Sequence, residues 1–144
     1  MTNSCVFCAI VAGEAPASTV YRDDMVIAFM DIRPANPGHV LVVPLEHADS
    51  ILDIRDEAIL ARMFSVGRQV AAALTDSGVR VEGFNLFLAN GTVAGQTVFH
   101  THLHVLPRFG GDGLGFSRAT NARMPLQSDL SELAQRIRRA GGWE

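Results

Sequence analysis

Five short segments of the chain carry the apolar pattern of β-strands. In each, apolar and β-branched residues alternate with polar ones or form a short run. The predicted strands are residues 19–22, 26–31, 39–43, 84–89 and 102–106. Asp23 and Asp24 predict a hairpin turn between the first two strands. The two prolines and the glycine of residues 33–38 exclude a helix or a central strand there.

The pattern becomes helical between residues 53 and 77. Apolar residues recur there at intervals of three or four, with charged residues between them: Ile59, Met63, Val66, Val70 and Leu74. Gly78 follows as a C-terminal stop signal. We therefore expect one long amphipathic helix, with shorter helices near 7–13 and 128–139.

The order of these elements predicts the fold class. Five strands with one long helix between the third and the fourth predict an α+β domain with a mostly antiparallel sheet. The 144 residues contain no repeat, low-complexity tract or interdomain linker, so we expect a single domain over residues 1–144. Residues 109–127 are predicted to form a loop.

Composition and charge restrict the class of partner. A hydrophobic fraction of 48% and a charged fraction of 19% are typical of a folded globular protein. The net charge of -3 and the pI near 5.9 argue against a broad nucleic-acid-binding surface. All the basic side chains besides histidine are arginine, and we interpret their one cluster, at 136–139, as a solvated helix end.

The chain contains no apolar run that approaches the roughly 18–20 residues of a membrane span. Its start, MTNSCVFCAI, lacks the basic segment, long apolar core and cleavage site of a secretory signal. The expected compartment is the cytoplasm, with no membrane and no nucleic-acid partner. In that compartment two cysteines are more often metal ligands or thiols than a structural disulfide.

Three of the five histidines, His100, His102 and His104, alternate along the last predicted strand. Residues two apart on a strand share a face, so the imidazoles should line an open face or a cleft. The residues that should instead face the core are Phe99, Thr101, Leu103 and Val105. The histidines could be solvated polar residues, joint ligands of a catalytic zinc ion, or a nucleophile with proton donors.

The segment before this strand, LANGTVAGQT, is rich in donors. Asn90, Gln96 and Thr97 offer amide and hydroxyl groups, and Gly91 and Gly95 let backbone N–H groups approach a ligand. This pattern indicates an anion such as phosphate beside the histidines. The segment is not a Walker loop, because it has neither the lysine nor the spacing of that motif.

Cys5 and Cys8 form a CxxC motif close to the N-terminus. The motif could be half of a zinc site, a redox pair or two unconnected thiols. The redox interpretation is the weakest, because a thioredoxin-like redox pair follows a strand and only four residues precede Cys5. A zinc site needs two more ligands. His47 and one histidine of the last strand would complete a closed, and therefore structural, Cys₂His₂ set.

The segment HTHLHVL at 100–106 matches the histidine-triad signature. Three longer segments, CVFCAIVAGEAPASTVYRDD, IAFMDIRPANPGHVLVVPLEH and AGQTVFHTHLHVLPR, resemble in order the nucleotide-binding-protein branch of the histidine triad (HIT) family. The resemblance covers about residues 5–108, with 109–144 left as a C-terminal loop and helix. It implies the α+β HIT fold and a homodimer in which two five-stranded sheets join.

The resemblance also implies an activity, nucleotidyl transfer or hydrolysis at the α-phosphate of purine nucleotides such as adenosine phosphoramidates. His102 would be the nucleophile that forms a nucleotidyl-histidine, and His104 would bind and help to protonate the phosphate. Asp31 would hold the ribose hydroxyls, and His39 would support the triad from behind. Two alternatives stay open: a zinc hydrolase that uses all three triad histidines, and a binding module with vestigial hydrolysis.

The remaining nucleotide-binding residues follow from the same resemblance. Polar contacts to the phosphate and leaving group would come from Asn90, Gln96 and Thr97, and Val98 is grouped with them. Apolar residues that sandwich the base would be Phe7, Ile10, Phe29 and Ile32, for which packing in the core is an equally good interpretation.

Some members of the family carry zinc on a CxxC motif and two histidines, one of them the first of the triad. The corresponding residues here are Cys5, Cys8, His47 and His100. Because members without the cysteines keep the fold, the resemblance implies that Zn²⁺ is structural and that catalysis needs no cofactor.

Overall fold

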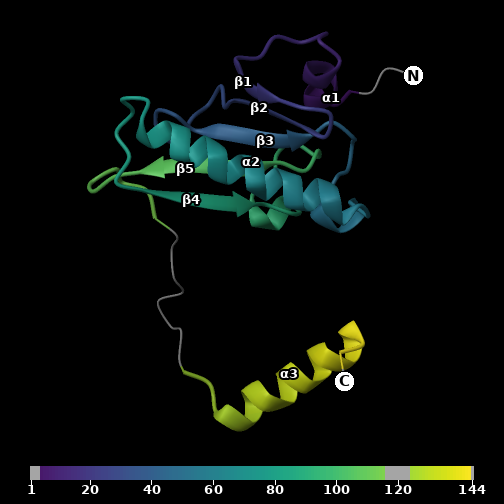
Figure 1. Cartoon of the computed structure of the whole chain (residues 1–144). Coiled ribbons are helices and arrows are strands. Elements are labelled where there is room, and N and C mark those ends of the chain that lie inside the picture. Colours follow the sequence, from purple (N-terminus) through teal and green to yellow (C-terminus); the bar gives the residue numbers. More distant parts are fainter. Residues whose placement is uncertain (1–3, 116–123, 144) are drawn as a thin grey trace. The chain divides into compact units, whose positions relative to one another are not determined.

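The computed structural model describes residues 4–115 and 124–143 (Figure 1). The chain forms two compact units, Met1–Leu114 and Gly115–Glu144. The first unit contains the sheet, two helices and every residue that the sequence proposes for a site. Within the described ranges, no helix has both the length and the apolar character that a membrane crossing requires.

The first unit is built on a five-stranded sheet in which every pair of neighbours is antiparallel. The strands are β1 (Thr19–Arg22), β2 (Val26–Met30), β3 (Val40–Pro44), β4 (Gly83–Leu88) and β5 (Leu103–Arg108), in the order β1-β2-β3-β5-β4. Each predicted strand is present, and the boundaries differ by at most two residues. The predicted α+β class and antiparallel sheet are confirmed.

The hairpin between β1 and β2 turns at Asp23, as its sequence predicted. The Asp23 carboxylate accepts hydrogen bonds from the backbone N–H groups of Met25 and Val26, both at 2.8 Å. Its second oxygen accepts from the Tyr21 hydroxyl and from Arg62 Nε. These bonds hold the pKa of Asp23 well below its usual range and tie the turn to the long helix.

The long helix α2 (Glu57–Thr75) covers one face of the sheet (Figure 1). It was predicted from residue 53, but it begins four residues later. Ser50 and Asp53 form a capping box around a separate 3₁₀ turn, η1 (Ile51–Asp53), and Asp56 then caps α2 by accepting from Ala58 N–H. Two capping signals therefore lie in succession, and the second one starts the helix.

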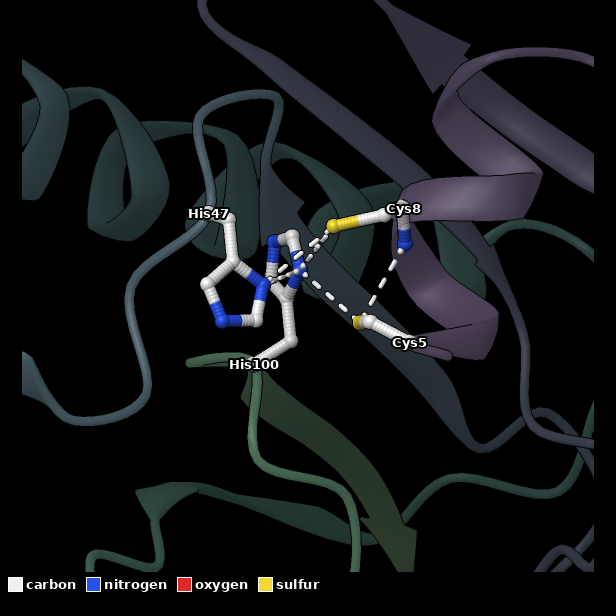
Figure 2. A group of neighbouring side chains, drawn as sticks. All are labelled: Cys5, Cys8, His47 and His100. Carbon is white, nitrogen blue, oxygen red and sulfur yellow. Dashed lines mark hydrogen bonds between the residues drawn. The ribbon is translucent and has the colours of Figure 1, made fainter. Parts of the chain in front are cut away.

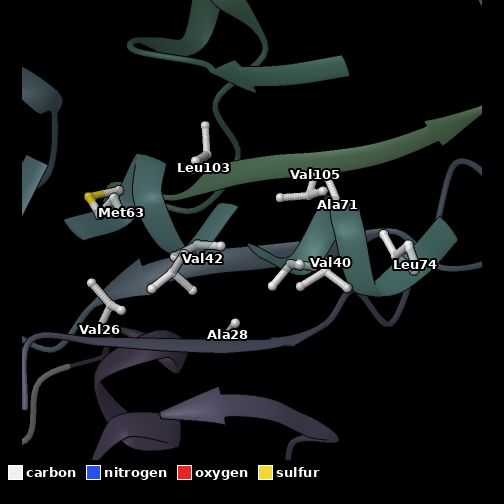
Figure 3. Packing of buried hydrophobic residues seen from close by; sticks show 11 residues of the cluster. Val26, Ala28, Val40, Val42, Met63, Ala71, Leu74, Leu103 and Val105 are labelled. Atoms are coloured by element: carbon white, nitrogen blue, oxygen red, sulfur yellow. The ribbon is translucent and has the colours of Figure 1, made fainter. Parts of the chain in front are cut away.

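The main core lies between α2 and the sheet. Figure 3 shows the facing side chains, which include Met63, Ala71 and Leu74 from the helix and Val26, Ala28, Val40, Val42, Leu103 and Val105 from the strands. At Gly67 the helix lies close to β5, since a Cβ there would be 2.7 Å from Leu103 Cδ2. Any larger residue at this position would therefore require the Leu103 side chain to shift.

The other face of the central strands packs against a short N-terminal helix, α1 (Val6–Val11). Phe7 of α1 and alternate residues of β2 and β3 form this second cluster, which consists of Phe7, Ile27, Phe29, Leu41 and Val43. β2 and β3 are therefore buried on both faces, which explains why they read as continuous apolar runs.

The chain after β5 is held by a side-chain cluster. Arg108 donates from Nε and Nη2 to Asp112, at 2.7 and 2.9 Å, and Asn36 donates to Asp112 Oδ2 at 3.0 Å. This part of the predicted 109–127 loop is thus fixed to β5, while 116–123 lie outside the described residues. The second unit contains α3 (Gln127–Gly141), which ends at Gly142 with a φ of 70°.

Candidate active site and metal centre

A cavity of about 390 Å³ opens between α1, β2 and the N-terminal part of β5. Its lining includes the predicted nucleotide-binding residues Phe7, Ile10, Phe29, Asp31, Ile32, Thr97, Val98, His102 and His104. The sequence separates these residues by up to about a hundred positions, and the fold brings them to one place. We call this cavity the histidine pocket.

The triad histidines lie on the α1 side of the sheet. Leu103 and Val105 point to the opposite side, into the core, as the alternation predicted. The expectation for Phe99 was wrong, because its side chain is 46% exposed. β5 begins only at Leu103, and the chain bends at 98–100, so alternation does not extend back to Phe99. His100, expected on an open face or in a cleft, is fully buried.

Pairing of β3 with β5 determines where the three rings lie. Val42 stands opposite Leu103, so the residues after β3 run beside the residues before β5. Thr101 N–H donates to Ala48 O at 2.7 Å across this junction. His100 is therefore near the end of β3, whereas His102 and His104 lie over the histidine pocket, with ring centroids 4.8 Å apart.

The contacts of His102 determine which of its ring nitrogens carries the hydrogen. Its Nδ1 lies 2.7 Å from the carbonyl oxygen of His100, which can only accept, so Nδ1 carries the hydrogen. The Nε2 atom then keeps its lone pair. Burial lowers the pKa of His102, which keeps the ring neutral at neutral pH. A neutral imidazole with an unprotonated Nε2 is a nucleophile.

His104 is polarised in the opposite sense through His39. Ala35 N–H donates to His39 Nδ1 at 3.1 Å, so a neutral His39 carries its hydrogen on Nε2. His39 Nε2 lies 2.9 Å from His104 Nδ1 and donates to it, which leaves the His104 hydrogen on Nε2. Burial, then the neighbouring His102 and His39, lower the pKa of His104 to about 4. His104 is therefore a neutral hydrogen-bond donor.

Aromatic and apolar side chains form the other wall of the histidine pocket. The Phe7 and Phe29 rings meet edge to face, with centroids 5.3 Å apart, and both are buried. They both fill the core and line the pocket, so the two interpretations of these residues are compatible. Ile32 is 91% exposed and stands at the rim, so core packing is excluded for this residue.

Asp31 combines a structural contact with a position at the pocket. One carboxylate oxygen accepts from Arg33 N–H at 2.8 Å and the other lies 3.7 Å from His39 Nδ1. The carboxylate therefore lies beside the His39–His104 pair and lines the same cavity.

The side chains of Asn90 and Gln96 bond to backbone groups of the protein and do not line the pocket. Asn90 Oδ1 accepts from Ile51 N–H, and Gln96 Oε1 accepts from Gly91 N–H, both at 2.8 Å. Gln96 Nε2 donates to the carbonyls of Asp49 and Val98. These bonds fix the segment that presents Thr97 and Val98 to the pocket, an indirect role that spacing alone did not reveal.

Two supporting residues were not anticipated from the sequence. The Phe87 ring stacks on His104, with centroids 4.3 Å apart and planes 5° apart, because the two residues face each other in the β4–β5 register. Asp49 Oδ1 lies 2.7 Å from His47 Nε2. A correct strand register would have indicated the first contact, and the two-residue spacing from His47 is a weak signal of the second.

Beside the histidine pocket, the sulfur atoms of Cys5 and Cys8 converge with Nδ1 of His47 and of His100 (Figure 2). The distances are 3.4 Å from Cys5 Sγ to His100, 3.5 Å from Cys8 Sγ to His100, 3.2 Å from Cys8 Sγ to His47, and 3.2 Å between the two nitrogens. The donors of a tetrahedral zinc ion, with bonds of about 2.0–2.3 Å, stand about 3.3–3.8 Å apart. The cluster fits zinc.

The hydrogen bonds around this cluster aim its lone pairs inward. His100 Nε2 donates to Pro44 O at 2.8 Å and His47 Nε2 donates to Asp49, so each Nδ1 is unprotonated. Burial and then the neighbouring Cys5 raise the pKa of the Cys8 thiol to about 11. A divalent cation reverses this effect, because it stabilises thiolates. Two sulfur and two imidazole donors suit Zn²⁺ and leave no position for a catalytic water.

The triad histidines themselves do not form a joint metal site. Among the described residues, the groups that could hold an ion are Cys5, Cys8, His47 and His100, and a second set of Asp31, His39 and His104. In the second set, Nδ1 of His39 and of His104 already accept hydrogen bonds. The geometry therefore separates His100 from His102 and His104, and disfavours a zinc ion held by all three.

The fold and the paired histidines define a class of proteins that carry a histidine triad on an antiparallel sheet, and comparison with known proteins agrees. The family model of the HIT domain matches residues 12–111. The chain belongs to the HIT family, whose members are nucleotide hydrolases and transferases.

Similar proteins extend over nearly the whole chain. An Arabidopsis thaliana protein named adenylylsulfatase HINT3 is 34% identical over 140 residues, which cover 96% of this chain and 70% of that protein. A zinc-bound histidine triad family protein from Mycobacterium smegmatis is 46% identical, with a TM-score of 0.73 and coverage of 82% and 84%. A HIT family protein from Bacillus subtilis has a TM-score of 0.87 at 35% identity, with coverage of 95% and 96%.

Proposed function

We propose that this protein hydrolyses or transfers nucleotidyl groups at the α-phosphate of purine nucleotides, of the adenosine phosphoramidate type, through a nucleotidyl-His102 intermediate. One observation carries the proposal. His102 is held through Nδ1–H on the His100 carbonyl, which leaves the Nε2 lone pair free beside a second imidazole that donates.

In the first step, His102 Nε2 forms a bond to the α-phosphorus, and the bond to the amine or other leaving group breaks. The leaving group takes the electron pair and a proton from solvent, and the water that attacks in the second step returns one proton to solvent. The positive charge that develops on His102 is stabilised by the Nδ1–H bond to the His100 carbonyl, which shortens and strengthens as the ring becomes cationic. In the second step, water attacks phosphorus and the bond to Nε2 breaks, which restores the neutral ring.

His104 stabilises charge on the phosphate in both steps. Its Nε2–H donates to a non-bridging phosphate oxygen, and the His39 contact keeps the hydrogen on that nitrogen. Thr97 adds a hydroxyl donor from the loop that Gln96 braces. Such fixed donors act on charge that develops in the transition state and need no reorganisation.

The nucleoside half of the substrate fits the remaining lining. Phe7 and Phe29, with Ile10 and Ile32, offer apolar surface to a purine base, and Asp31 offers a carboxylate to the ribose hydroxyls. The relative named as an adenylylsulfatase supports an adenylyl substrate class.

We also propose that Cys5, Cys8, His47 and His100 hold a structural Zn²⁺ ion and that the protein is a homodimer. The donor geometry and the zinc-bound relative from Mycobacterium smegmatis support the metal. When bound, zinc would tie the N-terminal segment to the ends of β3 and β5. For the dimer, the edge strands β1 and β4 leave two places where a second sheet could join, and the molar mass in solution tests it.

The test of the activity is mass spectrometry of the intact protein, mixed briefly with an adenosine phosphoramidate and stopped with denaturant at alkaline pH. We expect an adenylyl adduct that maps to His102 and accumulates when the second step is slow. His102→Ala should bind AMP but form no adduct.

Other outcomes would overturn the proposal in distinct ways. Turnover that stops as soon as a chelator is added, without any adduct in the untreated protein, would indicate a zinc hydrolase. AMP binding with negligible turnover that His102→Ala does not change would indicate a binding module.

A further inference from the structure

The short helix α1 belongs to both sites at once. Cys5 caps its N-terminus by accepting from Cys8 N–H at 3.4 Å, and both residues are donors of the metal cluster. Phe7 and Ile10, on the same helix, line the histidine pocket. A helix of six residues is not stable by itself, so its position depends on what holds it.

Phe7 is the contact between the two sites. It stands in the sequence between the two cysteines, and its buried ring meets His102 edge to face, with centroids 5.1 Å apart at 89°. The same ring lies 6.0 Å from His100 and 5.3 Å from Phe29. Any shift of the N-terminal half of α1 therefore moves the surface against which the nucleophile packs.

A second link runs through the backbone of His100. The His100 ring turns its Nδ1 to the metal cluster and its Nε2 to Pro44 O, while its carbonyl oxygen accepts the His102 Nδ1–H. His100 thus offers Nδ1 of its side chain as a metal ligand, and its main-chain carbonyl orients the proposed nucleophile His102. Two groups that contact His102 are thus linked to the metal cluster: the Phe7 ring lies between the two cysteines in sequence, and the carbonyl belongs to His100 itself.

The two ends of α1 differ in what secures them. At the C-terminal end, Arg22 donates to Val11 O at 3.1 Å, and the N–H groups of Glu14 and Ala15 donate to Ala9 O. At the N-terminal end, Phe7 packs in the second core cluster, and the two cysteines connect the helix to His47 and His100. A bound metal ion therefore acts on the end of the helix that carries Phe7.

We propose that metal binding at this cluster and nucleotide binding in the histidine pocket are thermodynamically coupled, with Phe7 as the positioning residue. The inference rests on the proposed function only in taking an adenine nucleotide as the pocket's ligand. An occupied metal site holds Phe7 in place for the base and for His102, so it raises nucleotide affinity. By reciprocity, bound nucleotide raises metal affinity by the same factor.

A metal that only stabilises the fold makes a different prediction. It raises the temperature of unfolding, but it leaves nucleotide affinity unchanged at temperatures where both forms are folded. Coupling through Phe7 instead changes the affinity itself, by roughly fivefold or more. Affinity measured well below the unfolding transition therefore separates the two roles.

The experiment measures the Kd of AMP by calorimetry for zinc-loaded and for metal-free protein, at a temperature where circular dichroism shows both folded. We expect weaker binding by the metal-free form, by roughly fivefold or more. In a competition with a chelating dye, AMP should tighten zinc binding by the same ratio. Equal AMP affinities in the two forms would overturn the coupling and leave the proposed function intact.

Two matched variants test the route. Phe7→Leu should retain zinc and reduce the ratio of the two AMP affinities towards one. Ile10→Val changes the same helix and pocket without a ring contact to His102, so it should weaken AMP binding in both forms and keep the ratio. If both variants bring the ratio of the two AMP affinities equally close to one, a role specific to Phe7 is contradicted.

A measurement on metal-loaded protein decides the question if the metal-free form does not fold. With Co²⁺ in place of zinc, the visible spectrum reports ligand geometry, and saturating AMP should change it in the wild type but not in Phe7→Leu. No change in the wild type would overturn the coupling. If zinc-loaded wild type does not bind AMP at all, the proposed function fails, and the coupling fails with it.

Discussion

The two imidazoles of the histidine pocket are chemically opposite although they are the same residue type two positions apart. His102 receives its orientation from a carbonyl acceptor and keeps a lone pair, while His104 receives a hydrogen bond from His39 and keeps a hydrogen. Neutral histidine has one donor and one acceptor nitrogen, so one contact at Nδ1 decides the state of Nε2. The backbone of His100 and the ring of His39 thus assign the two chemical roles.

The lowered pKa values predict the pH dependence of turnover. Burial lowers the pKa of His102 below 6.5 and that of His104 to about 4. As the pH falls through its lowered pKa, His102 takes up a proton and loses its nucleophilic lone pair. We expect kcat/KM to stay level from about pH 8 to below pH 6.5 and to fall only in more acidic solution. An acid limb with its midpoint at or above pH 6.5 would contradict this assignment.

Replacing His39 tests the donor relay to His104. In His39→Phe the His104 Nδ1 loses its donor, so the ring can move its hydrogen to Nδ1 and turn a lone pair towards the phosphate. We expect kcat to fall on the order of a hundredfold with little change in the Kd of AMP. His39→Gln keeps an N–H donor and should recover part of the loss. Single-turnover rates and calorimetry of AMP binding measure the two effects.

At the scale of elements, the packing of α2 on β5 depends on one glycine. Gly67→Ala would place a Cβ 2.7 Å from a methyl group of the fully buried Leu103, so the Leu103 side chain would have to shift within the core. We expect the free energy of unfolding to fall by about 1–2 kcal/mol, since overpacking outweighs the gain in helix propensity. Arg68→Ala, on the exposed side of α2, should change it by less than about 0.5 kcal/mol. Urea denaturation compares the two.

The elements could be predicted because each has a clear period and most ends carry a signal. The five strands and α2 follow from alternation and from the recurrence of apolar residues at three or four positions. The start of α2 could not be predicted, because Ser50 and Asp56 both act as N-caps and only the local fold decides which of them starts the long helix. Phe99 was misplaced for a related reason, since a strand's period says nothing about where its ladder of hydrogen bonds begins.

Sequence motifs predicted those residues of the candidate site that belong to a motif. The resemblance named every residue of the metal cluster and most of the lining of the histidine pocket. It could not show that the amide of Gln96 is occupied by Asp49 O, a partner 47 positions away. Nor could it indicate Phe87 on His104, which depends on the register of two strands. Contacts of this kind arise from tertiary structure and leave no local pattern.

At the scale of the whole molecule, the metal cluster joins the N-terminal segment to the sheet. In Cys5→Ser with Cys8→Ser, both sulfur donors are lost, and with them the stabilisation that a bound ion gives to the folded state. We expect zinc content near zero and a free energy of unfolding lower by roughly 3 kcal/mol or more. Metal analysis and chemical denaturation measure these changes. Zinc retained in the double variant would show that the ligands are assigned wrongly.

The ligands of the metal cluster come from three distant stretches of the chain, which has a consequence for biosynthesis. Cys8 and His47 are 39 residues apart, and His47 and His100 are 53 apart. The pairing of β3 with β5 brings the two histidines together, so the complete set of four donors would form only once the central sheet is assembled. Binding of the proposed ion would thus be a late step that reports correct assembly. In a cell short of zinc, freshly made chains would keep an unfastened N-terminus within reach of proteases.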